Sequence, residues 1–265
     1  MIGALRYEVA RLRTLRSTWW LLGISLLVTA GVALTIALVS RNQTLEVEYL
    51  AVALTGGSEF SGIPVPAVFA GLVGAFCLGH EYRYGTVRPA LSAVPSRSAL
   101  VLAKLVVTSV WAVILALLSV GVGYLTVLLV PDHGLLESGD TWDAVARPIV
   151  GFVLVVMIWN VVGLSLAGIF RSLPAAIIFL LVIPLVVENI LFALLQFVPA
   201  LDDVSWLTKY LPFSAGTAMV AVFEPSDFDQ PDFDIATPLQ GGITFGAFAL
   251  VLFLLCWALF RTRDA

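Results

Sequence analysis

His80 and Glu81 begin like the H-E-x-x-H motif, in which two histidines one helical turn apart bind zinc and the glutamate acts as a base. Tyr84 stands where the second histidine belongs, and His133 is the only other histidine in the chain. The sequence therefore predicts that this segment holds no metal.

Phosphate chemistry would need a Gly-Lys pair followed by Ser or Thr, because the backbone amides and the lysine of that loop hold the phosphates. The two lysines, Lys104 and Lys209, follow Ala103 and Thr208 instead. The chain also lacks the G-x-S-x-G motif of serine hydrolases. We expect no catalytic residue and no cofactor in this chain.

A carboxylate inside an apolar run is the third candidate for chemistry. Glu188 lies beside Asn189 in a long hydrophobic run, and Asn160 lies in the run before it. An acidic side chain at that depth is costly, so it should face other helices or a cavity. Two interpretations stay open: Glu188 contacts a substrate or a proton, or it is a neutral acid that bonds Asn160 or a backbone carbonyl.

The elements that position these residues follow from the composition. Of 265 residues, 60% are hydrophobic and 12% are charged, and the mean hydropathy is +1.02. These values lie outside the range of soluble domains, so the bilayer is the solvent for most of the chain. A net charge of −4 argues against a nucleic-acid partner. Cys77 and Cys256 lie in apolar runs, and we expect buried thiols.

Six apolar runs are long enough to cross the hydrocarbon core, which needs about 20 residues. They predict an all-α protein with a single transmembrane domain over residues 1–265. The predicted spans are residues 19–39, 62–79, 99–130, 148–170, 174–198 and 241–260.

The positive charges give these spans a direction. With both termini inside, the inner segments hold 11 of the 14 Lys and Arg residues, and only Arg41, Arg147 and Lys209 lie outside. The positive-inside rule requires this asymmetry. We therefore expect both termini in the cytoplasm.

Residues 1–18 predict an amphipathic helix at the inner surface of the membrane. Glu8 and Arg16 intrude on its apolar stripe. Anionic lipid attracts each arginine beside such a stripe by about 1 kcal/mol. A frayed basic tail is the alternative. The stripe consists of Leu5, Val9, Leu12, Leu15 and Trp19.

Residues 80–98 form the longest inner loop and predict a short helix. Thr86 follows Gly85 as a candidate N-cap, Pro89 fits a first turn, and Pro95 ends the helix. An ordinary basic loop that fixes the topology is the alternative.

Residues 199–240 form the longest outer segment. Residues 204–223 are apolar and predict helices that lie at the outer interface or dip into it. Residues 224–234 are acidic and carry four aspartates without the spacing of an EF-hand, which favours a solvated loop over a calcium site.

Taken together, these features resemble the membrane-spanning permease subunits of ABC transporters of the type 2 exporter class, particularly those of Gram-positive bacteria and actinomycetes. The resemblance covers nearly the whole chain. It is carried by the basic N-terminal helix, the six spans, the inner sequence of residues 81–88 with Pro95-Ser96-Arg97 and Lys104, and Leu211-Pro212-Phe213 before the last span. The inner loop is its most specific part.

The resemblance implies a coupling helix at residues 85–94 that contacts a separate ATPase subunit, which would hold ATP and magnesium. It also implies a second permease copy, identical or paralogous, in a bacterial plasma membrane. The implied activity is outward transport of an amphiphilic drug, peptide antibiotic or lipid-like substrate, and hence antibiotic resistance. The expected coupling residues are Glu81, Tyr82, Arg83, Gly85, Thr86, Arg88, Pro95 and Arg97.

Two other functions stay open from the residues alone. One is a proton-coupled secondary transporter that uses Glu188, although no internal repeat pairs the two halves as is frequent in that class. The other is a noncatalytic membrane scaffold or sensor.

Overall fold

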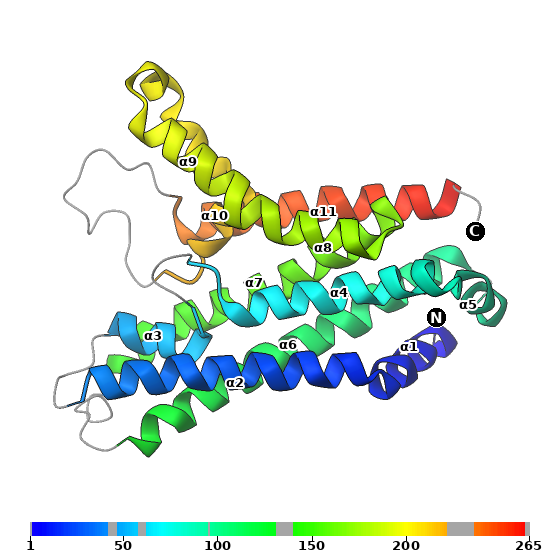
Figure 1. Ribbon diagram of the computed structural model, residues 1–265, viewed down its shortest axis with the longest axis horizontal. Helices are drawn as coiled ribbons and strands as arrows, with labels where there is room; N and C mark the ends of the chain where they lie inside the picture. Colours follow the sequence, from blue (N-terminus) through cyan, green and yellow to red (C-terminus); the bar gives the residue numbers. More distant parts are fainter. Residues whose placement is uncertain are drawn as a thin grey trace.

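The computed structural model describes residues 2–41, 47–57, 62–94, 96–130, 140–221 and 236–262. Within these ranges every regular element is a helix (Figure 1). The predicted fold class is thereby confirmed. Pro95 and the acidic residues 224–234 lie outside the described residues.

Six helical segments of the described chain are long and apolar enough to cross a membrane, and each overlaps one predicted span. The second span extends furthest beyond the prediction, to Tyr84, because the helix continues through polar residues until Gly85 ends it. The segments are α2 (Arg16–Val39), α4 (Val65–Tyr84), α6 (Arg97–Leu129), the part of α7 (Asp140–Phe170) from Val145 on, Leu173–Phe197, and α11 (Pro238–Thr262).

The helices α4 and α7 form the core of the bundle. About 61% of the apolar window of α4 and 56% of that of α7 is buried, against 17–28% in the other four spans. Glycines bring the two helices together: a Cβ on Gly163 would lie 1.9 Å from the carbonyl oxygen of Gly71, and one on Gly74 would lie 2.1 Å from that of Asn160. Their backbones are therefore in direct contact.

The fifth span is interrupted by a turn of π-helix. It consists of α8 (Leu173–Val182), the π-helical η2 (Ile183–Val187) and α9 (Glu188–Phe197). Pro184 lies in η2 and has no N–H to donate, which favours an irregular turn at this position. The chain then continues through the 3₁₀-helix η3 (Pro199–Tyr210) into α10 (Pro212–Thr217), which packs on α11.

Three short helices complete the bundle: α1 (Ile2–Thr14), α3 (Val47–Thr55) and α5 (Val87–Ala93). The sequence patterns did not indicate α3, which packs against α2, α6 and α7. Figure 1 shows α1, α5 and both ends of the chain at one end of the bundle, and α3 and the α9–η3 hairpin toward the other.

Candidate functional site

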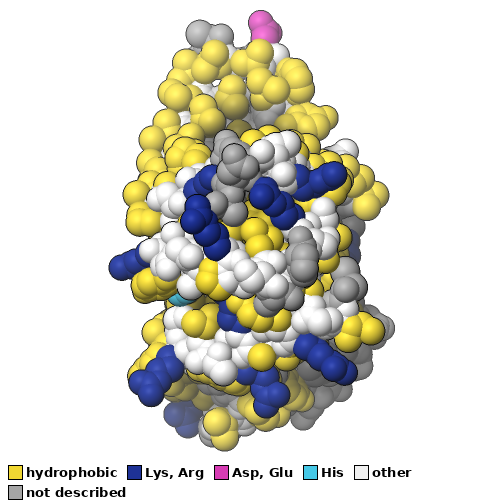
Figure 2. Space-filling view, turned by 90° about the vertical axis from the view of Figure 1, so that its right-hand side faces the viewer, with side chains coloured by type: hydrophobic (Ala, Val, Ile, Leu, Met, Phe, Trp, Pro, Cys, Tyr) yellow, Lys and Arg dark blue, Asp and Glu magenta, His cyan; other side chains and the backbone are white. Residues whose placement is uncertain are grey.

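The end of the bundle that carries α1 and α5 is rich in arginine, and we call it the basic end. Figure 2 looks onto this end and shows Lys and Arg side chains spread over it. Such a surface is suited to an acidic partner or to anionic headgroups. The exposed arginines that α1, α2, α4, α5 and α11 contribute are Arg6, Arg13, Arg16, Arg83, Arg88 and Arg261.

Local backbone signals set the position of α5 between α4 and α6. Gly85 ends α4 with a φ of 65°, a left-handed conformation that glycine adopts without strain. Thr86 takes the N-cap position of α5 but makes no side-chain cap hydrogen bond. Ser96 caps α6, because its side chain accepts a hydrogen bond from the N–H of Ala99. The helix predicted for this loop therefore exists over residues 87–93.

One face of α5 is anchored and the other is exposed. Val87 and Ala90 are buried against the bundle, whereas Arg88 and Pro89 are exposed. A short helix with one buried face and one exposed face can contact a partner protein while it stays packed on the bundle.

Two of the predicted coupling residues contact other helix ends. The guanidinium of Arg171, in the turn between α7 and α8, lies 5.8 Å from the ring centroid of Tyr82. Arg97 donates 3.4 Å hydrogen bonds to the carbonyl oxygens of Phe260 and Arg261, at the end of α11. A cation at a helix C-terminus is favoured by the helix dipole. The neighbourhood of α5 is thus tied to α7, α8 and α11.

A buried ionic cluster lies beneath the basic end and joins α1, α4 and α6. Nζ of Lys104 on α6 lies 2.5 Å from Oε1 of Glu8 on α1 and 2.5 Å from Oε1 of Glu81 on α4. Arg11 donates to Oε2 of Glu8 at 2.8 Å and to Sγ of Cys77 at 2.8 Å. The Lys104 and Glu8 side chains are 0% exposed.

The charges within this cluster compensate one another. Two cations face two carboxylates, as buried charges require if their desolvation is to be offset. Burial works against the charged form of Arg11, yet its interactions with Cys77, Glu8 and Glu81 raise the pKa of its guanidinium above the ordinary value. Removing any one member would leave a buried charge without its counterpart. The cluster therefore fixes α1 onto the first turns of α6 and the last turns of α4.

Glu8, Lys104 and Glu81 lie in other positions than the sequence patterns predicted. On α1 the inward face is Ala4, Glu8 and Leu12, so Glu8 belongs to that face instead of intruding on it, while Val9 of the predicted stripe is 43% exposed. Lys104, which the charge count had placed with the inner segments, is buried inside the bundle. Ala4, Glu8 and Leu12 are spaced four residues apart, which places them on one face of a helix, and this spacing was the sequence signal for the buried face of α1.

Glu81 also faces inward and is 2% exposed. Its predicted role was a polar contact with an ATPase, and a direct contact of that kind would require it to leave Lys104. Of the predicted coupling residues, Arg83, Gly85, Thr86 and Arg88 are at the surface.

Residues 4–224 match the family model described as "ABC-2 family transporter protein". The chain belongs to the ABC-2 transporter family. The matched range includes α1 from Ala4 on, the ionic cluster, α5 and α10. Membership makes the chain the membrane permease subunit of an ABC transporter, as its resemblance indicated, and it implies an ATPase partner. No curated protein matches the sequence.

In this ABC-2 permease, Glu188 caps the short helix α10. Its carboxylate accepts hydrogen bonds from the backbone N–H of Phe213 (3.0 Å) and of Ser214 (2.7 Å), and from the Ser214 hydroxyl (2.9 Å). A carboxylate at a helix N-terminus satisfies N–H groups that have no partner within the helix. The side chain is 3% exposed, so the cap is shielded from solvent.

The cap holds Phe213 in the aromatic interior of the permease. The ring of Phe213 lies 5.0 Å from Trp159 on α7, and 5.4 Å and 5.8 Å from Phe245 and Phe248 on α11, measured between centroids. Glu188 thereby links the π-turn of the fifth span to the packing of α7 and α11.

The predicted intramembrane polar residues do not form one site. Asn160 donates to the Thr108 hydroxyl at 3.0 Å, and Asn189 donates to the carbonyl oxygens of Pro184 and Leu185 in its own span. Neither bonds Glu188, so the Asn160 contact, one of the partners left open for Glu188, does not form in this structure. The donors that Glu188 engages are backbone amides of residues 213 and 214, at the start of α10.

Proposed function

We propose that this ABC-2 permease belongs to an ATP-driven exporter that moves an amphiphilic substrate outward, with a separate ATPase subunit bound at α5. The exposed face of α5, which lies between α4 and α6 in the chain at the basic end, supports this proposal most strongly. In it, ATP and magnesium are held by the partner, the basic end faces the cytoplasm of a bacterial cell, and a second permease copy, identical or paralogous, completes the pathway.

Force on α5 would reach the core through defined contacts. Because α5 is joined to α4 on one side and to α6 on the other, a displacement of α5 moves both helices. The Glu8–Lys104–Glu81 contacts would transmit this displacement to α1. The close glycine contacts between α4 and α7 would transmit it to α7 in the core. A chain without a phosphate-binding loop can use ATP only through a partner's conformational change of this kind.

Charge on the exposed face predicts the character of the partner surface. Arg83 and Arg88 are exposed on adjoining helices at the basic end, so we expect acidic side chains in the groove of the ATPase that receives α5. Such complementarity sets specificity and association rate more than affinity.

The proposal is tested by co-purification from the native host in mild detergent. A tagged permease should bring down a soluble ATPase subunit, and Arg88→Glu should weaken that association several-fold. Arg13→Glu is the matched control, because Arg13 is exposed at the same end but lies on α1. Equal losses for both variants would assign the effect to overall charge, and absence of any ATPase would refute the role of α5.

The contacts of Glu188 bear on the proton-coupled alternative. Three donors already engage its carboxylate, which favours a structural role. In reconstituted vesicles we therefore expect ATP-dependent efflux of an amphiphilic drug to persist in Glu188→Gln and after collapse of the proton gradient. Drug or antibiotic efflux in this assay would also exclude a purely scaffolding role.

A further inference from the structure

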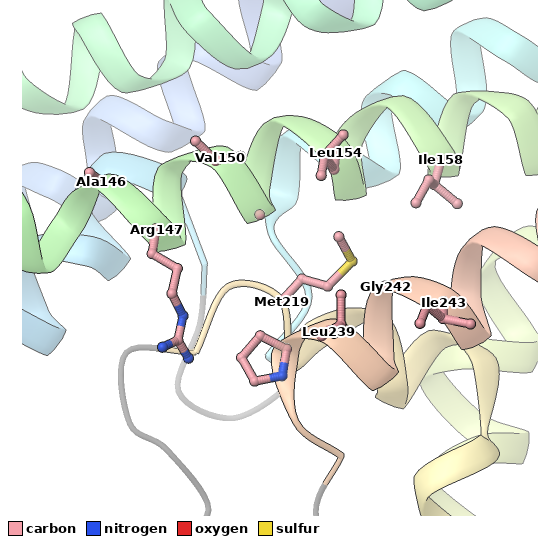
Figure 3. Close-up of a pocket in the computed structure, with 11 residues that line it drawn as sticks. Ala146, Arg147, Val150, Leu154, Ile158, Met219, Leu239, Gly242 and Ile243 are labelled. Atoms are coloured by element: carbon pink, nitrogen blue, oxygen red, sulfur yellow. The ribbon is translucent and has the colours of Figure 1, made fainter.

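A groove opens between α7 and α11 in the half of the bundle away from the basic end, with a volume of about 680 Å³ (Figure 3). Val150, Leu154 and Ile158 of α7 line one side, and Leu239 and Ile243 of α11 line the other. The volume falls in the range of roughly 300–1,000 Å³ of sites that bind small molecules.

Two glycines produce the hollow by seating Met219 as its floor. A Cβ on Gly151 would lie 1.8 Å from the carbonyl oxygen of Met219. A Cβ on Gly242 would lie 3.3 Å from Cε of Met219. Figure 3 shows the Met219 side chain between α7 and α11. Methionine is flexible and polarizable, so this floor can adapt to an alkyl chain.

The length of the groove matches one leaflet of a bilayer. From Ala146 to Ile158 the lining follows α7 for about 18 Å at about 1.5 Å per residue, slightly more than half of a hydrocarbon core of about 30 Å. Arg147 lines the groove at the end that we call its mouth, and it directly precedes the apolar run of α7 that begins at Pro148. A cation thus stands at headgroup level above an apolar channel of acyl-chain length.

The groove is also accessible from the side. Val150 is 61% exposed, Ile243 63% and Leu239 75%, so a lipid can enter laterally without crossing water. A wall that is apolar along one leaflet and cationic at its mouth is complementary to an amphiphile with an anionic head.

We propose that this groove binds one acyl chain of an anionic phospholipid, with its phosphate at Arg147. The lipid comes from the leaflet opposite the basic end, which is the outer leaflet in the orientation proposed above. This proposal concerns a lipid taken up from the surrounding membrane, so it goes beyond the proposed export function.

Photocrosslinking in vesicles tests the site. The purified full-length protein is reconstituted with trace phosphatidylglycerol that carries a diazirine on its acyl chain, and labelled peptides are mapped by mass spectrometry. Phosphatidylcholine with the same chain is the probe for headgroup preference. We expect several-fold more labelling of residues 146–158 and 239–243 by phosphatidylglycerol.

Variants assign the labelling to the groove. Leu154→Trp fills it from α7 and Ile243→Trp fills it from α11, and either should reduce labelling several-fold. Leu128→Trp is the control, because Leu128 is similarly exposed, 43% against 40%, on α6. Arg147→Gln should abolish the preference for phosphatidylglycerol, while Arg41→Gln, also away from the basic end, should preserve it.

Equal labelling by the two lipids in the wild type, or an unchanged preference in Arg147→Gln, would overturn the proposal. So would labelling that both tryptophan variants in the groove leave intact. No ATPase is present in these vesicles, so such a failure would leave the export function untouched. Absence of an ATPase from the co-purification would likewise leave this site untouched.

Discussion

Lys104 is the residue on which three helices converge. It lies seven residues into α6, at a depth where a lysine needs compensation, and a carboxylate from each of two neighbouring helices provides it. Replacing one partner of a buried pair costs more than the pair contributes, because the remaining charge stays desolvated.

Lys104→Met should therefore lower the free energy of unfolding by about 3–5 kcal/mol, since Glu8 and Glu81 would then face each other with only Arg11 nearby. Denaturation in detergent micelles followed by circular dichroism measures this loss. Adding Glu81→Gln, which leaves Glu8 paired with Arg11, removes the uncompensated charge and should restore most of the stability. A double variant no more stable than Lys104→Met would contradict the ionic explanation.

The Glu188 cap makes a second prediction at this scale. Hydrogen bonds to a charged acceptor contribute about 1.5–3 kcal/mol, so Glu188→Ala should lower the free energy of unfolding by roughly that amount. Glu188→Gln keeps one acceptor oxygen and should lose less. Asn189→Ala, next in the chain, removes bonds only to carbonyls of its own span and serves as the control; an equal loss there would argue against the cap.

Among the elements, α5 depends on the way the chain leaves α4. Gly85 reverses the direction of the backbone with a positive φ, and Val87 and Ala90 then hold α5 against the bundle. The orientation of the coupling face is therefore set by one backbone conformation and two small contacts. This makes α5 easy to misplace without unfolding the spans.

Gly85→Ala should cost about 1–2 kcal/mol, the penalty for an L-residue in the left-handed region, and should weaken ATPase co-purification. No atom lies within 4 Å of a Cβ at this position, so the penalty is conformational and not steric. Gly121→Ala on α6 is the control, because its Cβ is equally unobstructed and its φ is not positive. Thermal unfolding in detergent compares them, and similar stabilities would contradict the left-handed requirement.

For the whole molecule, the concentration of exposed arginines at the basic end predicts which side of the membrane this end faces. The basic end carries α5, and η3 lies at the far end of α9 (Figure 1). The free cysteines Cys77 and Cys256 are both buried, so introduced cysteines report on sidedness against a low background.

A membrane-impermeant maleimide should label Asp203→Cys on η3 in intact cells, and should label Ser92→Cys on α5 only after permeabilisation. Both positions are exposed, so accessibility in detergent is the control for each. The physical reason is the retention of positive charge on the cytoplasmic side during insertion. Labelling of Ser92→Cys in intact cells would reverse the proposed orientation.

Hydropathy along the chain was sufficient to locate the spans and the all-helical class. An unsatisfied backbone in lipid is so costly that an apolar run of about 20 residues has essentially one structure available, the helix. The Gly85 and Thr86 signals likewise located the start of α5, because caps and breakers act over one or two turns. These features depend on neighbours in the sequence and can be read from it.

Only the tertiary structure decided which polar residues meet. Glu8 and Lys104 are 96 positions apart, and Glu188 and Phe213 are 25 apart on different segments, so their pairing depends on how helices pack and rotate. Hydropathy marks a charge in an apolar run as costly but does not name its partner. The groove floor has the same origin, since Met219 reaches it only because Gly151 and Gly242 leave room between two spans.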